Sequence, residues 1–259
     1  MSYRQTFKIF FLITISLAFV STNLFSSNLT ADEIIKEANK IMNQRTSKAK
    51  ISMMITTSSG KRRTFVYDSY SKNFGEKNLM IYLKPSRVKN EAILMLNNAD
   101  DIWMYFPRTN RIRKLATHAK KRKMEGSDFS YEDMGANNAF ITDFSSQSIG
   151  KEKVNKTICY KLELKRKKKS NSGYSRLIVW VNKSNFCILE IEYYNEKYPS
   201  VLEKILFCKD IKIIDGIPTP MRMIMKNARD NTETIIEMFD IKYNIELDDT
   251  LFTERGMKG

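Results

Sequence analysis

The segment EGSDFSYEDM, residues 125–134, brings the carboxylates of Asp128, Glu132 and Asp133 close together. Asp128 and Glu132 are four residues apart, so a helix would place both on one face, where they could bind a hard cation or act as acid and base. With Asp133, the segment still supplies only part of the roughly six to eight oxygens that calcium takes. Acidic residues are also typical of a first helical turn, and Ser127 or Asp128 would be a good N-cap. We therefore favour a helix start over a metal or acid/base site.

Other catalytic groups are scarce. The single histidine, His118, lies in the lysine-rich run ATHAKKRK, and the spacing of Cys159, Cys187 and Cys208 matches no zinc motif. Strand alternation places Cys187 and Cys208 on opposite faces, so we expect free thiols. The chain contains no G-x-S-x-G, P-loop or G-x-G-x-x-G motif. We therefore expect a protein that is not an enzyme and uses no cofactor or metal, with a hydrolase based on Asp128 and Glu132 as a remote alternative.

Residues 1–27 have the pattern of a secretory signal peptide. Arg4 and Lys8 form a basic start, and an apolar run extends from Ile9 to Val20 before small polar residues begin. This run is shorter than the roughly 20 residues that cross a bilayer. We expect cleavage somewhere in residues 22–27, with an uncleaved N-terminal anchor as the alternative.

The formal net charge is +15, and residues 1–27 contribute only two of its cations. Such a charge favours anionic partners, namely lipid headgroups, nucleic acid or acidic protein surfaces, and export argues against nucleic acid. Basic residues are densest over residues 108–123, where Arg108, Arg111 and Arg113 suit bidentate contacts to phosphate or carboxylate. The alternative is a solvated loop that pairs with the acids of residues 125–133.

Periodicity predicts a mainly β protein with a little helix. Thr30 and Glu33 fit a capping box, and apolar residues at helical spacing predict an amphipathic helix over residues 31–45. From Lys48 onward the period changes to two, and about eleven short strands follow, joined by tight turns as in an antiparallel meander. No alternation of strands with helices appears. Residues 28–259 are therefore expected to form a single domain.

Two strands, AILML (residues 92–96) and IWMYF (residues 102–106), are apolar on both faces. A strand of this kind is covered on both sides. Helices could form one cover and a cavity or a partner the other, and a plain two-layer core is the alternative. Met221, Met223 and Met225 share one strand face, and methionine lines surfaces that adapt to varied apolar ligands.

Four segments in a fixed order resemble the outer membrane lipoprotein-sorting protein family of the LolA/LolB-like superfamily. They are DDIWMYFPRTNRIRKL, KKRKMEGSDFSYEDM, DGIPTPMRMIM and TETIIEMFDIKYN, and the similarity covers residues 30–255. The closest branch is often found beside permeases of the resistance-nodulation-division (RND) class. The resemblance implies a strongly curved antiparallel sheet, an incomplete barrel, plugged by the helix at 31–45 and a second helical segment near 127–147. It also implies a monomeric periplasmic carrier of lipoprotein acyl chains or another lipid.

The expected site combines this resemblance with the residue patterns. Arg108, Arg111 and Arg113 would contact the cargo headgroup or a membrane partner, such as an inner-membrane permease for which the chain could be an accessory subunit. Gly126, Ser127 and Asp128 would form the hinge of a lid. The expected lipid cavity is lined by Leu94, Leu96, Trp103, Tyr105, Phe129, Tyr131, Met221, Met223 and Met225.

Overall fold

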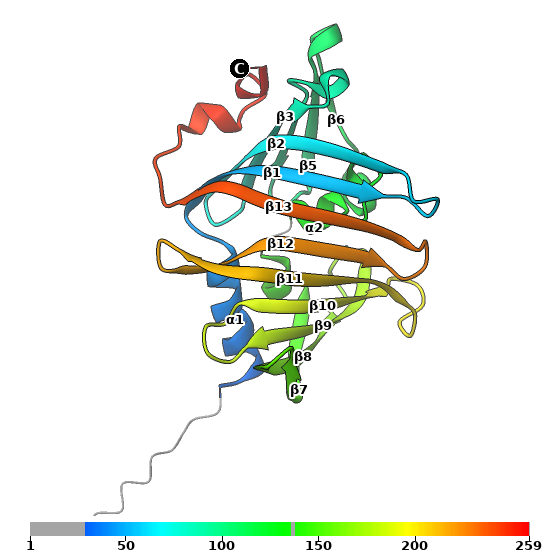
Figure 1. The fold of residues 1–259 in the computed structure, drawn as a ribbon, viewed down its shortest axis with the longest axis vertical. Coiled ribbons are helices and arrows are strands. Elements are labelled where there is room, and N and C mark those ends of the chain that lie inside the picture. Colours follow the sequence, from blue (N-terminus) through cyan, green and yellow to red (C-terminus); the bar gives the residue numbers. More distant parts are fainter. Residues whose placement is uncertain (1–28, 136–137, 259) are drawn as a thin grey trace, which may run out of the picture.

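The computed structural model describes residues 29–135 and 138–258, so the expected signal peptide lies outside the described part of the chain. The first element is helix α1 (Ala31–Met42), which lies behind the sheet in Figure 1. Thr30 accepts a hydrogen bond from the Glu33 backbone N–H at 3.2 Å, and its own N–H donates to the Glu33 carboxylate at 2.8 Å. The predicted capping box is confirmed, and the helix ends at Met42 rather than at residue 45.

Thirteen strands of the described chain form one antiparallel sheet, confirming the expected incomplete barrel. Its order is β6-β5-β4-β3-β2-β1-β13-β12-β11-β10-β9-β8-β7, which leaves β6 and β7 as unpaired edges. Two meanders therefore join where β1 pairs with β13 (Figure 1). The strands are β1 (Thr46–Thr56), β2 (Arg62–Lys72), β3 (Lys77–Lys84), β4 (Ala92–Leu96), β5 (Asp101–Phe106), β6 (Arg111–Lys114), β7 (Phe144–Val154), β8 (Thr157–Arg166), β9 (Tyr174–Asn182), β10 (Ile188–Asn195), β11 (Leu202–Ile214), β12 (Ile217–Asn227) and β13 (Thr232–Tyr243).

The connection between the two edge strands, residues 115–143, is called the plug segment below. It contains two 3₁₀ turns, η3 (Thr117–Lys121) and η4 (Met124–Gly126), and two short helices, α2 (Tyr131–Gly135) and α3 (Ala139–Thr142). The expected helical segment near residues 127–147 is therefore wrong in extent, because the described residues of this stretch form only these two short helices and strand β7 begins at Phe144. Periodicity does not predict strand β7, because its sequence, FSSQSIGKEKV, shows no apolar alternation. Most of its residues are exposed.

The main core lies between the sheet, helix α1 and the plug segment. This interior cluster includes Ile34 and Ile35 from α1 and Met124, Phe129 and Tyr131 from the plug segment. Alternate residues of the strands complete it, as the period of two requires. They include Ile51, Met53, Tyr67, Tyr82, Leu206 and Ile236, all less than one-tenth exposed.

A second cluster lies on the opposite face of β3, β4 and β5. Leu79, Ala92, Leu94 and Tyr105 pack there against Phe252 and Met257. These last two belong to the 3₁₀ turns η5 (Asp249–Phe252) and η6 (Gly256–Lys258) of the C-terminal segment, which lies at the top left of Figure 1. The expectation that the doubly apolar strands are covered on both sides is confirmed. The second cover is formed by the C-terminal segment. The residues that pack together on this face are called the outer cluster below.

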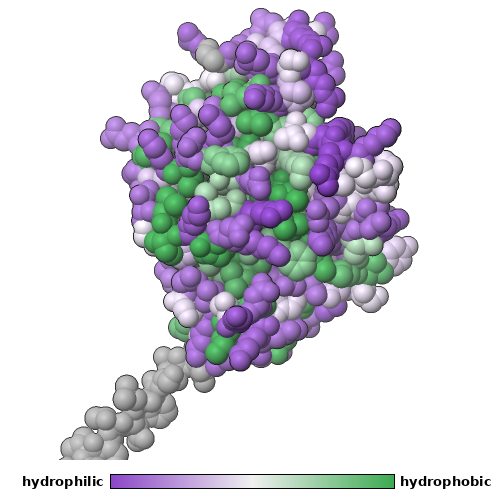
Figure 2. Space-filling model, viewed as in Figure 1, coloured by the Kyte–Doolittle hydropathy of each residue, from purple (hydrophilic) through white to green (hydrophobic). Residues whose placement is uncertain are grey.

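Elsewhere the outer face of the sheet mixes charged and apolar side chains, as Figure 2 shows. Ile213 and Phe239 are among its exposed apolar residues. Within residues 29–135 and 138–258, no helix is long and apolar enough to cross a membrane. All three cysteines are free thiols, as expected. Strand alternation also predicts that Cys208 points away from the core, and this is wrong, because Cys208 packs against the interior cluster.

The outer cluster generates the first prediction. Phe252 is 4% exposed, and Phe252→Ala should lower the free energy of unfolding by about 3 kcal/mol because it leaves a cavity under the C-terminal segment. Phe74 is 56% exposed, so Phe74→Ala should change it by less than about 0.5 kcal/mol. Urea unfolding of both variants measures the difference. Equal stability of the two would show that the C-terminal segment does not cover the sheet.

Candidate functional site

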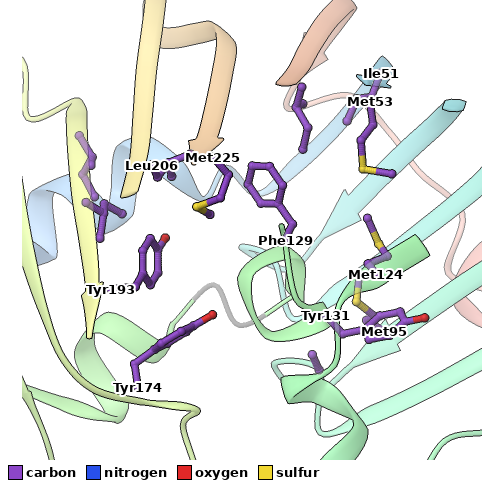
Figure 3. Close-up of a cluster of buried hydrophobic side chains, with 14 of the residues drawn as sticks. Ile51, Met53, Met95, Met124, Phe129, Tyr131, Tyr174, Tyr193, Leu206 and Met225 are labelled. Atoms are coloured by element: carbon purple, nitrogen blue, oxygen red, sulfur yellow. The ribbon is translucent and has the colours of Figure 1, made fainter. Parts of the chain in front are cut away.

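The concave side of the sheet is occupied by side chains of the plug segment. In Figure 3, Phe129 projects between Met225 of β12 on one side and Met53 of β1 on the other. Tyr131 and Met124 lie nearby, next to Met95 of β4. All of these side chains belong to the interior cluster and are at most 6% exposed. The space in which the resemblance places a lipid is thus filled by the protein's own residues.

Methionine makes this interior adaptable. Met53, Met80, Met95, Met124 and Met225 are fully buried there. Met104, Met134, Met223 and Met238 are partly buried and pack against them. A methionine side chain has three rotatable bonds and a polarisable sulfur, so it can refill a space of changed shape at low cost.

The plug segment is anchored by a buried ion pair. Lys204 of β11 places its ammonium 2.5 Å from the Asp133 carboxylate and 2.9 Å from the Asp128 carbonyl oxygen. The two side chains of the pair are 4% and 3% exposed. Tyr174 donates to the same carboxylate at 2.8 Å, and the rings of Tyr174 and Tyr193 lie 5.2 Å from the ammonium. A buried pair requires such additional bonds to offset the loss of hydration.

Asp128 binds a different strand. Its side chain accepts hydrogen bonds from the hydroxyls of Thr232 and Thr234 on β13, the latter at 2.8 Å, and its backbone N–H donates to Thr234 at 2.9 Å. Lys123, from the basic run, lies 3.7 Å from the carboxylate. Asp128 therefore fixes the plug segment to the sheet.

The expected helix cap at Ser127 or Asp128 is wrong by two or three positions. Helix α2 begins at Tyr131, and Ser130 forms the capping bonds. The Ser130 N–H donates to Asp133 at 2.6 Å, and the Asp133 N–H donates to the Ser130 hydroxyl at 3.1 Å. This reciprocal pair has the form of a capping box, with aspartate in place of glutamate.

Glu132 binds a third part of the sheet. It accepts hydrogen bonds from the Ser172 hydroxyl at 2.5 Å and from the Gly173 N–H at 2.9 Å, in the turn between β8 and β9. Burial raises the pKa of its carboxyl above the usual range. Asp128 and Glu132 are thus held by different elements, which gives no support to an acid/base pair. The alternative in which the basic run pairs with the acids of residues 125–133 does not hold for Asp133, whose cation is Lys204.

The three expected hinge residues lie at the start of this anchored stretch. Gly126 has a φ of +71°, and a Cβ there would lie 3.1 Å from the Arg63 guanidinium, so a side chain is disfavoured. Ser127 is fully buried, and its hydroxyl both donates to and accepts from the backbone of Phe129. Their role as a hinge stays a prediction, while these bonds favour holding the loop in place.

The structure divides the expected cavity residues between two faces. Phe129, Tyr131 and Met225 lie in the interior cluster, with Met223 against it, whereas Met221 is half-buried and outside that cluster. Leu94, Leu96, Trp103 and Tyr105 lie in or against the outer cluster instead. Their neighbours Ile93, Met95, Ile102 and Met104 face the interior. Because both strands are apolar on both faces, the sequence offered no signal for choosing between the two sets.

The three expected headgroup arginines do come together. Arg108, Arg111 and Arg113 line a pocket of about 280 Å³ at the turn between β5 and β6, with Phe106 and Glu91 in its wall. The Arg113 guanidinium lies 5.9 Å from the Phe106 ring centre. Burial raises the pKa of Glu91, and Arg108 opposes that shift. The pocket combines excess positive charge with an aromatic wall, which suits an anion attached to an apolar body.

No motif or spacing in the sequence singles out Tyr67 and Tyr82. They are cross-strand neighbours on β2 and β3, with ring centres 5.5 Å apart, and they are 0% and 1% exposed. Neither hydroxyl has a hydrogen-bond partner within residues 29–135 and 138–258. A buried polar group without a partner costs about 1–3 kcal/mol.

The anchor yields the second prediction. Lys204→Met should lower the free energy of unfolding by about 3–5 kcal/mol, because it leaves the Asp133 carboxylate buried without its cation. The double variant Lys204→Met/Asp133→Asn should be more stable than Lys204→Met, since both charges are gone. As a control, Lys161→Met breaks an ion pair whose partners are 31% and 51% exposed, and should cost at most about 1 kcal/mol. Urea unfolding tests all three, and a Lys204→Met variant as stable as Lys161→Met would contradict the buried anchor.

Three solved structures share this architecture over 88% of the chain. A DUF1329 family protein from Desulfovibrio piger has a TM-score of 0.78 and 27% identity, with 97% of its own chain covered. A putative outer membrane lipoprotein-sorting protein domain from Vibrio parahaemolyticus has a TM-score of 0.78 and 25% identity, with 98% covered. A LolA superfamily protein from Nitrosomonas europaea, 24% identical with 99% covered, has a TM-score of 0.74 and shows the shared fold.

At the level of sequence, no curated protein matches the chain. A protein-family model described as "uncharacterized protein" matches residues 75–259, which is more than half of the chain. The chain therefore belongs to the family that this model describes, and its resemblance to the outer membrane lipoprotein-sorting proteins of the LolA/LolB-like superfamily is confirmed.

Proposed function

We propose that the chain is a periplasmic carrier that binds lipoprotein acyl chains or another lipid inside its curved sheet and moves them toward the outer membrane. The observation that carries this proposal is the methionine-rich interior cluster, whose centre is occupied by one aromatic side chain of the plug segment, Phe129. The likeness to a lipoprotein-sorting domain supports the same function.

The energetics fit a reversible carrier. Each buried CH₂ of an acyl chain contributes about 0.8 kcal/mol, so a few methylenes offset the roughly 1.5–3 kcal/mol gained by burying a phenylalanine. Phe129 can therefore leave its place when cargo enters and return when cargo leaves. The methionines around it adjust to either occupant.

The pocket of Arg108, Arg111 and Arg113 gives the cargo's polar end a place to bind. Three guanidinium groups beside an aromatic ring suit a phosphate or carboxylate. The same pocket also supports the second candidate function, an accessory subunit that docks on an acidic surface of an RND-type permease. In that function the arginines bind the permease and the interior holds no cargo.

Removing the internal occupant tests the carrier. Phe129→Ala should bind a fluorescent acyl probe about tenfold more tightly than the wild-type chain, because the probe no longer competes with the phenyl ring. Phe252→Ala is the matched control, since it removes an equally buried phenyl group from the outer cluster. It should lose stability without a change in probe affinity.

Native mass spectrometry of the chain purified from the periplasm should also show copurified lipid. If the wild-type chain is lipid-free and neither variant binds acyl probes, the carrier function is wrong. A rise in affinity of the same size in both variants would place probe binding outside the interior.

Charge reversal separates the two functions of the arginine pocket. Arg108→Glu/Arg111→Glu should weaken binding of an anionic lysophospholipid at least about tenfold and leave binding of an uncharged monoacylglycerol unchanged. Lys168→Glu/Lys169→Glu, in the turn between β8 and β9, makes the same change in net charge and should leave both unchanged. If Arg108→Glu/Arg111→Glu binds lipid as the wild-type chain does but no longer retains the permease in a pull-down, the accessory-subunit function is favoured.

A further inference from the structure

The hydroxyls of Tyr67 and Tyr82 require an explanation that the fold does not supply. Both side chains belong to the interior cluster of buried hydrophobic residues. The rings of Tyr67, Tyr82 and Phe65 pack edge to face, so a phenylalanine at either position would preserve the packing. The oxygen atoms therefore contribute nothing to the apolar contacts and lack a partner within the described chain.

The two tyrosines neighbour both the wall of the arginine pocket and the methionine-rich interior. Tyr82 pairs with the neighbouring strand next to Glu91, since its N–H donates to the Glu91 carbonyl at 2.9 Å. Glu91 is also part of the wall of the arginine pocket. Arg87 lies 5.6 Å from the ring centre of Phe65, which in turn packs on Tyr82. On the inner side Tyr67 belongs to the same cluster as Met53 and Met95.

Burial and neighbouring acidic groups keep the Tyr82 hydroxyl protonated. Burial raises its pKa well above the usual range, and the Glu125 carboxylate and the Tyr67, Tyr131 and Glu91 side chains raise it further. The Tyr82 hydroxyl is therefore held neutral as a hydrogen-bond donor. Burial likewise raises the pKa of Tyr67.

An acyl lipid has one polar group between its head and its chain, the carbonyl of an ester or amide. The carbonyl oxygen accepts hydrogen bonds and cannot donate them, so an apolar site that takes up such a chain must supply a donor or leave the oxygen unpaired. Two neutral phenol hydroxyls that lack a partner among the described residues are donors of the required kind.

We propose that Tyr67 and Tyr82 form a carbonyl-binding site that recognises the ester or amide linkage of the cargo. The headgroup then lies in the arginine pocket and the chain extends into the methionine-rich interior. This inference rests on the proposed carrier function and adds a requirement to it, because a plain apolar cavity would bind any hydrocarbon chain equally well.

Matched ester and ether ligands test the site. Lysophosphatidylglycerol carries an ester carbonyl, and its 1-O-alkyl analogue has the same head and chain length without the carbonyl. Affinities of both below their micelle concentrations are measured by competition with a fluorescent acyl probe, using the full chain as exported. The variants are Tyr67→Phe, Tyr82→Phe and the double variant. Tyr160→Phe is the control, since Tyr160 packs against the same cluster from β8.

The wild-type chain should bind the ester more tightly than the ether. Each of the two substitutions should weaken ester binding about fivefold, the value of one hydrogen bond, and leave ether binding within about twofold. The double variant should bind ester and ether alike, and Tyr160→Phe should behave as wild type. Thermal unfolding of the double variant should occur at or above the wild-type temperature, because it removes buried polar groups that have no partner in the described part of the chain.

If the tyrosine substitutions weaken ester and ether binding equally, or weaken neither, the carbonyl site is wrong and the carrier function still stands. If the wild-type chain binds neither the ester nor the ether, both the carbonyl site and the carrier function are wrong. A clear fall in the unfolding temperature of the double variant would show that internal water already satisfies the hydroxyls, and would overturn the assignment of a free donor pair.

Discussion

The ion pair between Lys204 and Asp133 is the contact on which the interior depends. It joins the plug segment to β11 at a place where both side chains are almost fully buried, and each charge would be costly without the other. The pair is surrounded by groups that complete its hydrogen bonds, among them Tyr174 and the Asp128 carbonyl. Loss of either charge would therefore weaken the whole attachment of the plug segment and not a single contact.

The topology explains why such an attachment is needed. The plug segment connects the two free edges of the sheet, β6 and β7, which are consecutive in the chain and at opposite ends of the strand order. A sheet with two unpaired edges cannot exclude water from its concave side by strand pairing alone, as a closed barrel does. The plug segment supplies the missing wall, and the anchors at Asp128, Glu132 and Asp133 hold it against β13, the β8–β9 turn and β11.

Sequence reasoning succeeded where the determining contacts are local. The Thr30–Glu33 capping box and most strands followed from spacing alone, because their patterns span only a few residues. It failed where partners are distant in the chain. Lys204 lies 71 residues from Asp133, and Thr232 lies 104 residues from Asp128, so the carboxylates read as a helix start. The split of Leu94 and Met95 between two clusters was equally hidden, since both faces of their strand are apolar.

The order of residues in EGSDFSYEDM fixes the backbone of this segment and leaves the Phe129 ring free to rotate. Anchored and apolar positions alternate along it, with Asp128 before Phe129, and Glu132 and Asp133 after Tyr131. The backbone on both sides of Phe129 is therefore fixed by buried hydrogen bonds, whereas its phenyl ring is held only by apolar contacts with side chains such as Met225. Swinging the segment out as a lid would require breaking the ion pair and several buried bonds at once, each worth about 1 kcal/mol or more. Rotating one phenyl ring among methionines requires none of these. A carrier built in this way makes room for cargo by rearranging side chains, while the segment itself stays against the sheet.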